Sequence, residues 1–220
     1  VITLAMYSVQ GPVSGTLDFI WWDVSSGMQT SVYSSRDTTG YRAEARRYSG
    51  TVLMPFSPHP TGAVTKTTGL VTDGRTPEIR EYDTKGQLQR ILRAAIPGRA
   101  VTQEVLDGYV GWIMAVDGYT QDQAETSLQG IPIRETLPFF QALQVDESGW
   151  IWAELYGLDS TVPGEWMVFD PDGRAHGRIQ TPAGLDVRSI GEDFILGVWI
   201  DEFGVEHVHR YSLRRSAGGV

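Results

Sequence analysis

Two histidines stand two positions apart in a segment near the C-terminal end, Val205 to Leu213. Because side chains alternate along a β-strand, His207 and His209 would point to one face, as metal-binding His-x-His pairs do. Tyr211 and both ends of the segment share that face. These mainly apolar neighbours favour a half-buried sheet surface, so we predict no metal and no other cofactor, with His207 and His209 as the candidate ligands if a metal does bind.

The sequence Asp170-Pro-Asp-Gly173 resembles the start of a calcium-binding loop. An EF-hand loop beginning at Asp170 needs Gly at its sixth position and Glu at its twelfth. The chain has Ala175 and Thr181 there, so a tight turn is the better interpretation.

Motifs of the common enzyme classes are missing. The sequence contains no Gly-x-Ser-x-Gly elbow, His-Glu-x-x-His motif, P-loop or dinucleotide fingerprint. Carboxylates are numerous, but pairing them for acid–base chemistry needs a known geometry. These absences predict no catalytic residues, although an enzyme whose site gathers from several repeats stays open.

Two groups of side chains are candidates for binding a partner. Tyr109 and Trp112 lie on a predicted helical segment, where they either pack that segment down or present a docking surface. Arg42, Arg46 and Arg47 lie in a long polar connection, residues 35–60, in which we expect at most one strand, around 51–54. They form either a solvated loop or a site for an anionic partner.

Composition narrows the fold class and the partners. The chain has 220 residues, of which 41% are hydrophobic and 20% charged, as in ordinary globular proteins. Its 25 glycines and seven tryptophans suit an all-β protein with many turns. A net charge of −9 disfavours nucleic acid and anionic lipid as partners. No apolar run approaches the ~18 residues of a membrane-spanning helix, so we predict no transmembrane segment.

Short antiparallel hairpins recur along the chain. From Phe140 to Thr181, four short strands are joined partly by Asp-x-x-Gly turns at 146–149 and 170–173. In such a turn the Asp accepts a backbone hydrogen bond and the Gly takes the left-handed conformation. Four strands in about 40 residues match one propeller blade. The pattern returns over 62–93 and, with three strands, over 186–213.

One segment, residues 97–137, interrupts this rhythm. Apolar residues recur at helical spacing from Val101 to Val116, and Thr120-x-x-Gln123 is a capping-box start for a second helix. We therefore predict a short helical insertion at about 97–130.

In their order, these hairpins resemble the C-terminal part of bacterial six-bladed β-propellers of the NHL/TolB-like type. The resemblance covers residues from about 55 to 215 and is carried by Glu78–Arg90, Ala100–Glu104, Leu143–Trp152, Trp166–Arg174 and Gly204–Tyr211. It implies a propeller with about 3.5 visible four-stranded blades, an extracytoplasmic location (periplasmic or secreted) and no assigned activity. We expect one partial propeller domain over 1–215 and a flexible tail at 216–220.

The blade count sets the functional expectation. The family has six blades, and an open half ring would leave an unpaired edge strand, which proteins avoid. In closed propellers the N-terminal strand commonly completes the last blade. We therefore expect a protein partner, or the rest of the propeller, at the edges formed by 1–9 and 205–213.

Three functions remain open at this point. The first is a non-catalytic protein–protein interaction or scaffold module, such as an extrinsic accessory subunit of a larger complex. The second is a hydrolase- or lactonase-like propeller enzyme with a metal in its central channel. The third is a small-ligand or glycan binder that uses exposed tryptophans lining a groove.

Overall fold

The computed structural model of the protein describes residues 2–7, 15–37, 40–45, 48–129, 131–158 and 161–215. Strands dominate this part of the chain, and every strand pairing in it is antiparallel. The prediction of an all-β protein with a short helical insertion is confirmed at this level.

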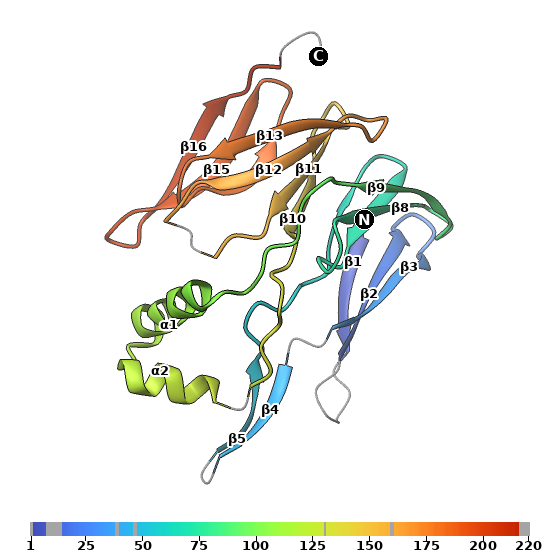
Figure 1. Cartoon of the computed structure of the whole chain (residues 1–220). Helices are drawn as coiled ribbons and strands as arrows, with labels where there is room; N and C mark the ends of the chain where they lie inside the picture. Colours follow the sequence, from blue (N-terminus) through green and yellow to red (C-terminus); the bar gives the residue numbers. More distant parts are fainter. Residues whose placement is uncertain are drawn as a thin grey trace.

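Four of the sheets follow one another along the chain (Figure 1). Sheet 1 contains β1 (Ile2–Tyr7), β2 (Gly15–Asp23) and β3 (Met28–Asp37). Sheet 2 contains β6 (Thr61–Val64), β7 (Thr68–Thr72), β8 (Glu78–Asp83) and β9 (Leu88–Arg93). Sheet 3 contains β10 (Phe140–Val145), β11 (Ile151–Leu155), β12 (Gly164–Phe169) and β13 (Ala175–Thr181). Sheet 4 contains β14 (Asp186–Ile190), β15 (Phe194–Ile200) and β16 (Glu206–Ser212).

A separate hairpin corrects one expectation from the sequence. The stretch 35–60 reads as a polar connection with at most one strand, yet β4 (Gly40–Ala45) pairs with β5 (Tyr48–Leu53). Tyr48, Thr51 and Val52 favour the extended conformation. The sequence did not predict β4 because this strand contains charged residues and lacks an apolar run.

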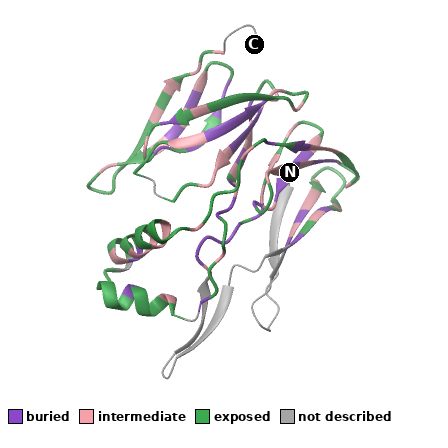
Figure 2. Ribbon diagram, viewed as in Figure 1, coloured by how far each residue is buried: buried purple, intermediate pink, exposed green. Residues whose placement is uncertain are grey.

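The helical insertion consists of α1 (Gln103–Asp117) and α2 (Gln121–Leu128). Thr102 caps α1 by accepting a hydrogen bond from the backbone N–H of Val105, and the predicted capping box between Thr120 and Gln123 is present at α2. Both helices are largely exposed (Figure 2). Among the described residues, no helix is long and apolar enough to cross a membrane.

Consecutive sheets pack face to face. Residues at successive positions point to opposite faces of a strand, so one strand can serve two cores. In sheet 2, Leu70 packs toward sheet 3 while Val71 packs toward sheet 1. In sheet 3, Ala153 packs toward sheet 2 while Trp152 packs toward sheet 4. Sheets 2 and 3 are thus covered on both faces (Figure 2).

The first strands of the later sheets lie next to one another, because β10 contacts both β6 and β14. The N-terminal strand, by contrast, does not complete sheet 4 as closed propellers would suggest. It pairs with β2 in sheet 1, with Ile2 opposite Trp21 and Tyr7 opposite Thr16. Ring closure is not seen in the described part of the chain, where sheet 4 has three strands.

Four tight turns share one hydrogen-bond scheme. Each begins with an Asp and has a Gly with positive φ three positions later. One carboxylate oxygen accepts backbone N–H groups inside the turn, and the other contacts the side chain six positions after the Asp. The Asp–partner pairs are Asp83–Gln89, Asp146–Trp152, Asp170–His176 and Asp201–His207. The hairpins therefore repeat this side-chain contact as well as the shape of the turn.

Candidate functional site

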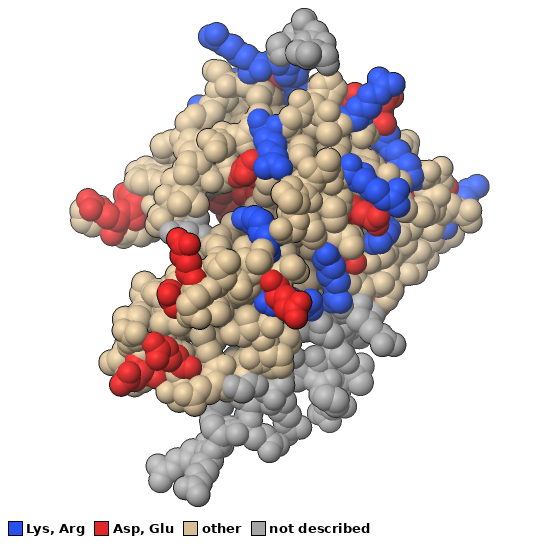
Figure 3. All heavy atoms as spheres, in the orientation of Figure 1, with Lys and Arg blue, Asp and Glu red and all other residues tan. Residues whose placement is uncertain are grey.

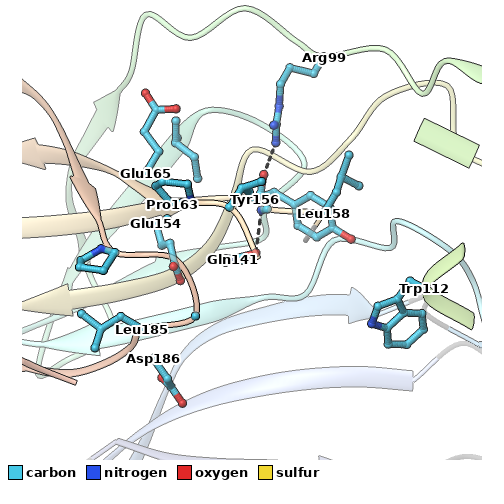
Figure 4. Close-up of a pocket in the computed structure, with 16 residues that line it drawn as sticks. Arg99, Trp112, Gln141, Glu154, Tyr156, Leu158, Pro163, Glu165, Leu185 and Asp186 are labelled. Atoms are coloured by element: carbon cyan, nitrogen blue, oxygen red, sulfur yellow. Dashed lines mark hydrogen bonds between the residues drawn. The ribbon is translucent and has the colours of Figure 1, made fainter. Parts of the chain in front are cut away.

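A cleft of ≈ 750 Å³ opens at one end of sheet 3 (Figure 4). Three connections meet there: the helical segment before β10, the loop between β11 and β12, and the loop between β13 and β14. The labelled side chains of the lining are Arg99, Trp112, Gln141, Glu154, Tyr156, Leu158, Pro163, Glu165, Leu185 and Asp186. Its volume lies within the range of small-ligand sites.

The aromatic wall of the cleft comes from helix α1. Tyr109 packs against Phe56 at 5.1 Å between ring centroids and stacks on Trp112 at 5.6 Å with an interplanar angle of 19°. Trp112 is 50% exposed and lies at one side of the cleft, across from Glu154 and Asp186 (Figure 4). Tyr109 thus packs the helix down, while Trp112 presents an open ring face.

The acidic wall comes from sheet 3 and the start of sheet 4. Burial raises the pKa of the Glu154 carboxyl above its usual value, a hydrogen bond from Gln141 acts in the opposite direction, and the charge of Asp186 raises the pKa further. Asp186 is itself paired with Arg188 at 2.6 Å on the surface. Burial thus favours the protonated form of the Glu154 carboxyl.

Gly164 is one of the residues that line the cleft. A side-chain carbon placed on Gly164 would lie 2.7 Å from Oγ1 of Thr181. It would also lie 3.3 Å from Oε1 of Glu154 and 3.9 Å from Nε1 of Trp166. A larger residue at position 164 would therefore crowd Thr181, so glycine allows β12 to lie close to these side chains.

Two hydrogen bonds fix the loop that follows β11. The guanidinium of Arg99 donates to the carbonyl oxygen of Tyr156, and the backbone N–H of Gly157 donates to Oε1 of Gln141 at 2.9 Å (Figure 4). Burial raises the pKa of the Tyr156 hydroxyl. Both contacts tie the loop to elements that precede it in the chain, so this edge of the cleft is held in place.

The two candidate metal ligands, His207 and His209, contact neighbouring polar side chains. Nε2 of His207 lies 2.8 Å from Oδ2 of Asp201, and Nδ1 of His209 lies 3.3 Å from the hydroxyl of Tyr211. Both imidazoles also lie beside Trp199, with ring centroids about 6 Å away. Across the described residues, no group of three or more His, Cys, Asp or Glu side chains is placed to hold a metal ion.

Sheet 4 has one covered face and one free face. Val187, Ile190 and Ile195 are buried against sheet 3. On the opposite face, defined here as the free face, Ile200 is 57% exposed and Val208 is 76% exposed. The strand register places Phe194, Leu196, Val198 and Arg210 on this free face.

The predicted arginine site and the two predicted edges lie only partly in the described part of the chain. Arg42 belongs to β4, but its side chain lies outside the described part of the chain, as do Arg46 and Arg47. Of the predicted edges, 205–213 coincides with β16, whose one neighbour in the described sheet is β15. The edge at 1–9 corresponds to β1, and residues 1, 8 and 9 are not described.

The cleft brings Trp112 together with residues that sequence reasoning did not select. Glu154 and Gly164 look like ordinary strand residues, and both reach the cleft because β11 pairs with β12. One signal was available: the strand begins with a Gly directly after Pro163, and Gly in a strand often marks a close approach of the backbone.

Comparison with known proteins adds no relative to this description. The sequence matches no protein-family model and no curated protein.

Proposed function

We propose that the chain is a non-catalytic interaction module of the β-propeller type, which uses the free face of sheet 4 to dock a further β-sheet. The resemblance to bacterial NHL/TolB-like propellers supports this proposal and favours an extracytoplasmic location. The docked sheet belongs either to the rest of a propeller or to a protein partner.

The arrangement of the sheets supports a propeller. Sheets 2, 3 and 4 each order their strands as the chain does, and each packs face to face with the next. Their first strands β6, β10 and β14 lie beside one another, as the inner strands of blades do around an axis. Figure 1 shows the sheets following one another across the molecule.

The free face of sheet 4 carries the functional part of the proposal. Sheets 2 and 3 bury side chains on both of their faces, whereas sheet 4 buries side chains on one face. Ile200 and Val208 stay more than half exposed, on a face that continues the stack. Adjoining apolar side chains on a sheet mark a surface that another element covers.

The chemistry of the free face fits another sheet. Its centre is a pleated surface of β-branched and aliphatic side chains, suited to packing at about 10 Å from a second sheet. Charged groups lie toward its rim: the guanidinium of Arg210 lies over the ring of Phe194 at 4.9 Å and pairs with Asp193 at 3.2 Å. An apolar centre with a polar rim is the usual anatomy of a protein interface.

Site-specific photo-crosslinking tests the proposal. A benzophenone amino acid replaces Val208 in the protein expressed in its native cells, and Val116 on α1, which is 60% exposed, provides the matched control position. We expect crosslinks from position 208 that map to a β-strand segment outside sheets 1–4. Equal crosslinking from both positions, or none from 208, would contradict docking at the free face.

A further inference from the structure

Helices α1 and α2 enclose a groove of ≈ 380 Å³ that shares no lining residue with the cleft. Its apolar lining comes from both helices and from the chain that follows them. These apolar residues are Leu106, Val110, Met114, Leu128 and Ile133. Each of them stays at least partly exposed. The chain thus leaves an apolar surface open to solvent between its two helices, as docking grooves do.

The polar lining of the groove is acidic. Asp107 of α1 and Glu125 of α2 both belong to it. Each accepts a hydrogen bond of 2.8 Å from the side-chain amide of the glutamine four positions earlier, Gln103 or Gln121. In the part of the chain that the structure describes, neither carboxylate forms an ion pair. The groove therefore carries one negative charge from each helix with only neutral partners.

The helical segment around the groove is acidic throughout. Residues 103–128 contain no Lys or Arg, and acidic side chains lie over the helices in Figure 3. Neither helix has a basic residue in its last turn, where cations would favourably meet the helix dipole. Charge complementarity therefore selects a basic partner. A second copy of this segment would be repelled, because it carries the same charge.

Two glycines stand on the exposed side of α1 beside the groove. Gly111 lines the groove, and Gly108 lies three positions before it. Apart from Pro, Gly is the least favourable residue in a helix interior. At both positions no atom of the described residues lies within 4 Å of the point that a side-chain carbon would take, so the packing of the chain on itself does not require glycine. Close approach by the backbone of another chain does require it.

We propose that the groove between α1 and α2 binds an amphipathic helix of a partner protein, with an apolar stripe flanked by Lys and Arg. The apolar side chains enter the groove, because a groove between two helices accepts the side-chain ridge of a third. The backbone of the bound helix passes over Gly108 and Gly111, and its cations pair with Asp107 and Glu125. This site is independent of the free face of sheet 4.

Selection from a displayed peptide library tests the proposal, with the whole 220-residue chain as the target. The probes are peptides of about 18 residues, long enough to form a helix, with apolar residues at helical spacing. Their other positions vary among Lys, Arg, Glu, Gln and Ala. We expect the enriched peptides to carry a net positive charge and to bind saturably, one peptide to one chain. A selection that enriches no peptide, or enriches peptides without net positive charge, overturns the proposal.

Matched variants of α1 locate the enriched peptide. Gly111→Leu should weaken its binding about tenfold or more, as measured by fluorescence anisotropy of the labelled peptide. The same change should not lower the urea midpoint of unfolding, because Leu favours a helix and the space at Gly111 is open. Val116 is 60% exposed on the same helix but lies about 140° around it from Gly111, so Val116→Leu should leave the affinity unchanged. Equal affinities of the two variants would overturn the proposal.

Neutral variants test the charge pairing. Replacing Asp107 with Asn and Glu125 with Gln together should weaken binding of the enriched peptide about tenfold at low salt. Asp122→Asn removes an acidic residue of α2 that does not line the groove, and it should weaken binding less than about twofold. Equal losses in these variants would mean that general attraction holds the peptide, and would overturn the assignment to the groove.

Sedimentation of the protein alone distinguishes a basic partner from a second copy. We expect Gly111→Leu to leave the oligomeric state unchanged. A dimer that Gly111→Leu dissociates would place a second copy in the groove and overturn the proposal. Val208→Asp should not change the affinity for the peptide, so this test and the docking test fail independently.

Discussion

The guanidinium of Arg215 lies 2.6 Å from the carboxylate of Asp146, although the two residues stand 69 positions apart. The Asp146 side chain is fully buried, and the same guanidinium lies 5.3 Å from the ring centroid of Trp150 and donates to the carbonyl oxygen of Gly191 at 3.2 Å. Arg215 thus joins the first turn of sheet 3 to the first turn of sheet 4.

Replacing Arg215 with Ala should destabilise the protein by about 2 kcal/mol, the size of a charge-assisted hydrogen bond. The loss stays below that of a fully orphaned buried charge, because Asp146 keeps the N–H groups of Ser148 and Trp150. Urea unfolding measures the change. The neighbouring Arg214→Ala removes an exposed arginine and should cost less than about 0.5 kcal/mol. Equal losses in the two variants would show that Arg215 does not join the sheets.

The shared turn scheme predicts acid behaviour. The backbone N–H of Arg174 and the imidazole of His176 hold the pKa of Asp170 below its usual 3.8. Since the folded pKa is lowered, the stabilising effect is present above 3.8 and is lost as the pH falls through the folded value. His176→Ala should raise the pKa of Asp170 toward 3.8, as followed by carboxyl ¹³C resonances. His59→Ala provides the control, and an unchanged Asp170 pKa in His176→Ala would show that the imidazole contact has no such effect.

Two turn glycines with similar backbone angles should respond differently to alanine. Gly204 has φ 78°, and no atom lies within 4 Å of the position that an added methyl carbon would take, so Gly204→Ala should cost about 1 kcal/mol from backbone strain alone. Gly86 has φ 76°, and an added carbon there would lie 2.5 Å from the carbonyl oxygen of Ser31 in sheet 1. Gly86→Ala should therefore cost about 2 kcal/mol or more, because overpacking adds to the strain. Thermal unfolding of both variants checks the order, and equal losses would mean that sheets 1 and 2 do not meet at this turn.

The partly buried carboxyl of Glu154 should make stability depend on pH. Burial raises the folded pKa of Glu154 above 4.5, so stability falls as the pH rises from that value through the folded pKa. Glu154→Gln should therefore increase the free energy of unfolding at pH 7 and have little effect at pH 4. Denaturant unfolding at both pH values measures this. Glu147→Gln, at an exposed turn position, should change neither, and a loss of stability at pH 7 in Glu154→Gln would contradict the burial of the charge.

The local structure was predictable because it follows from short-range rules. Alternating apolar residues and Asp-x-x-Gly turns located the strands of sheets 2, 3 and 4. The capping box at Thr120 located α2. The same turns also contained an unused signal: a Gln, Trp or His stands six positions after each of the four Asp residues.

Long-range features were not predictable in the same way. The approach of Glu154, Gly164 and Trp166 depends on the register of β11 against β12, which no local pattern specifies. The link from Arg215 to Asp146 spans two sheets. Trp112 could be selected as a binding candidate from the sequence, but the carboxyl group across the cleft from it could not.

Hydrogen exchange in sheet 4 tests the central claim most directly. In the protein isolated from its native source without denaturation, docking on the free face predicts slow exchange of the peptide covering β15 and β16. Val208→Asp should make that peptide exchange faster, whereas Val116→Asp should leave its exchange unchanged. Equally fast exchange in the native protein and in Val208→Asp would mean that no further sheet docks there.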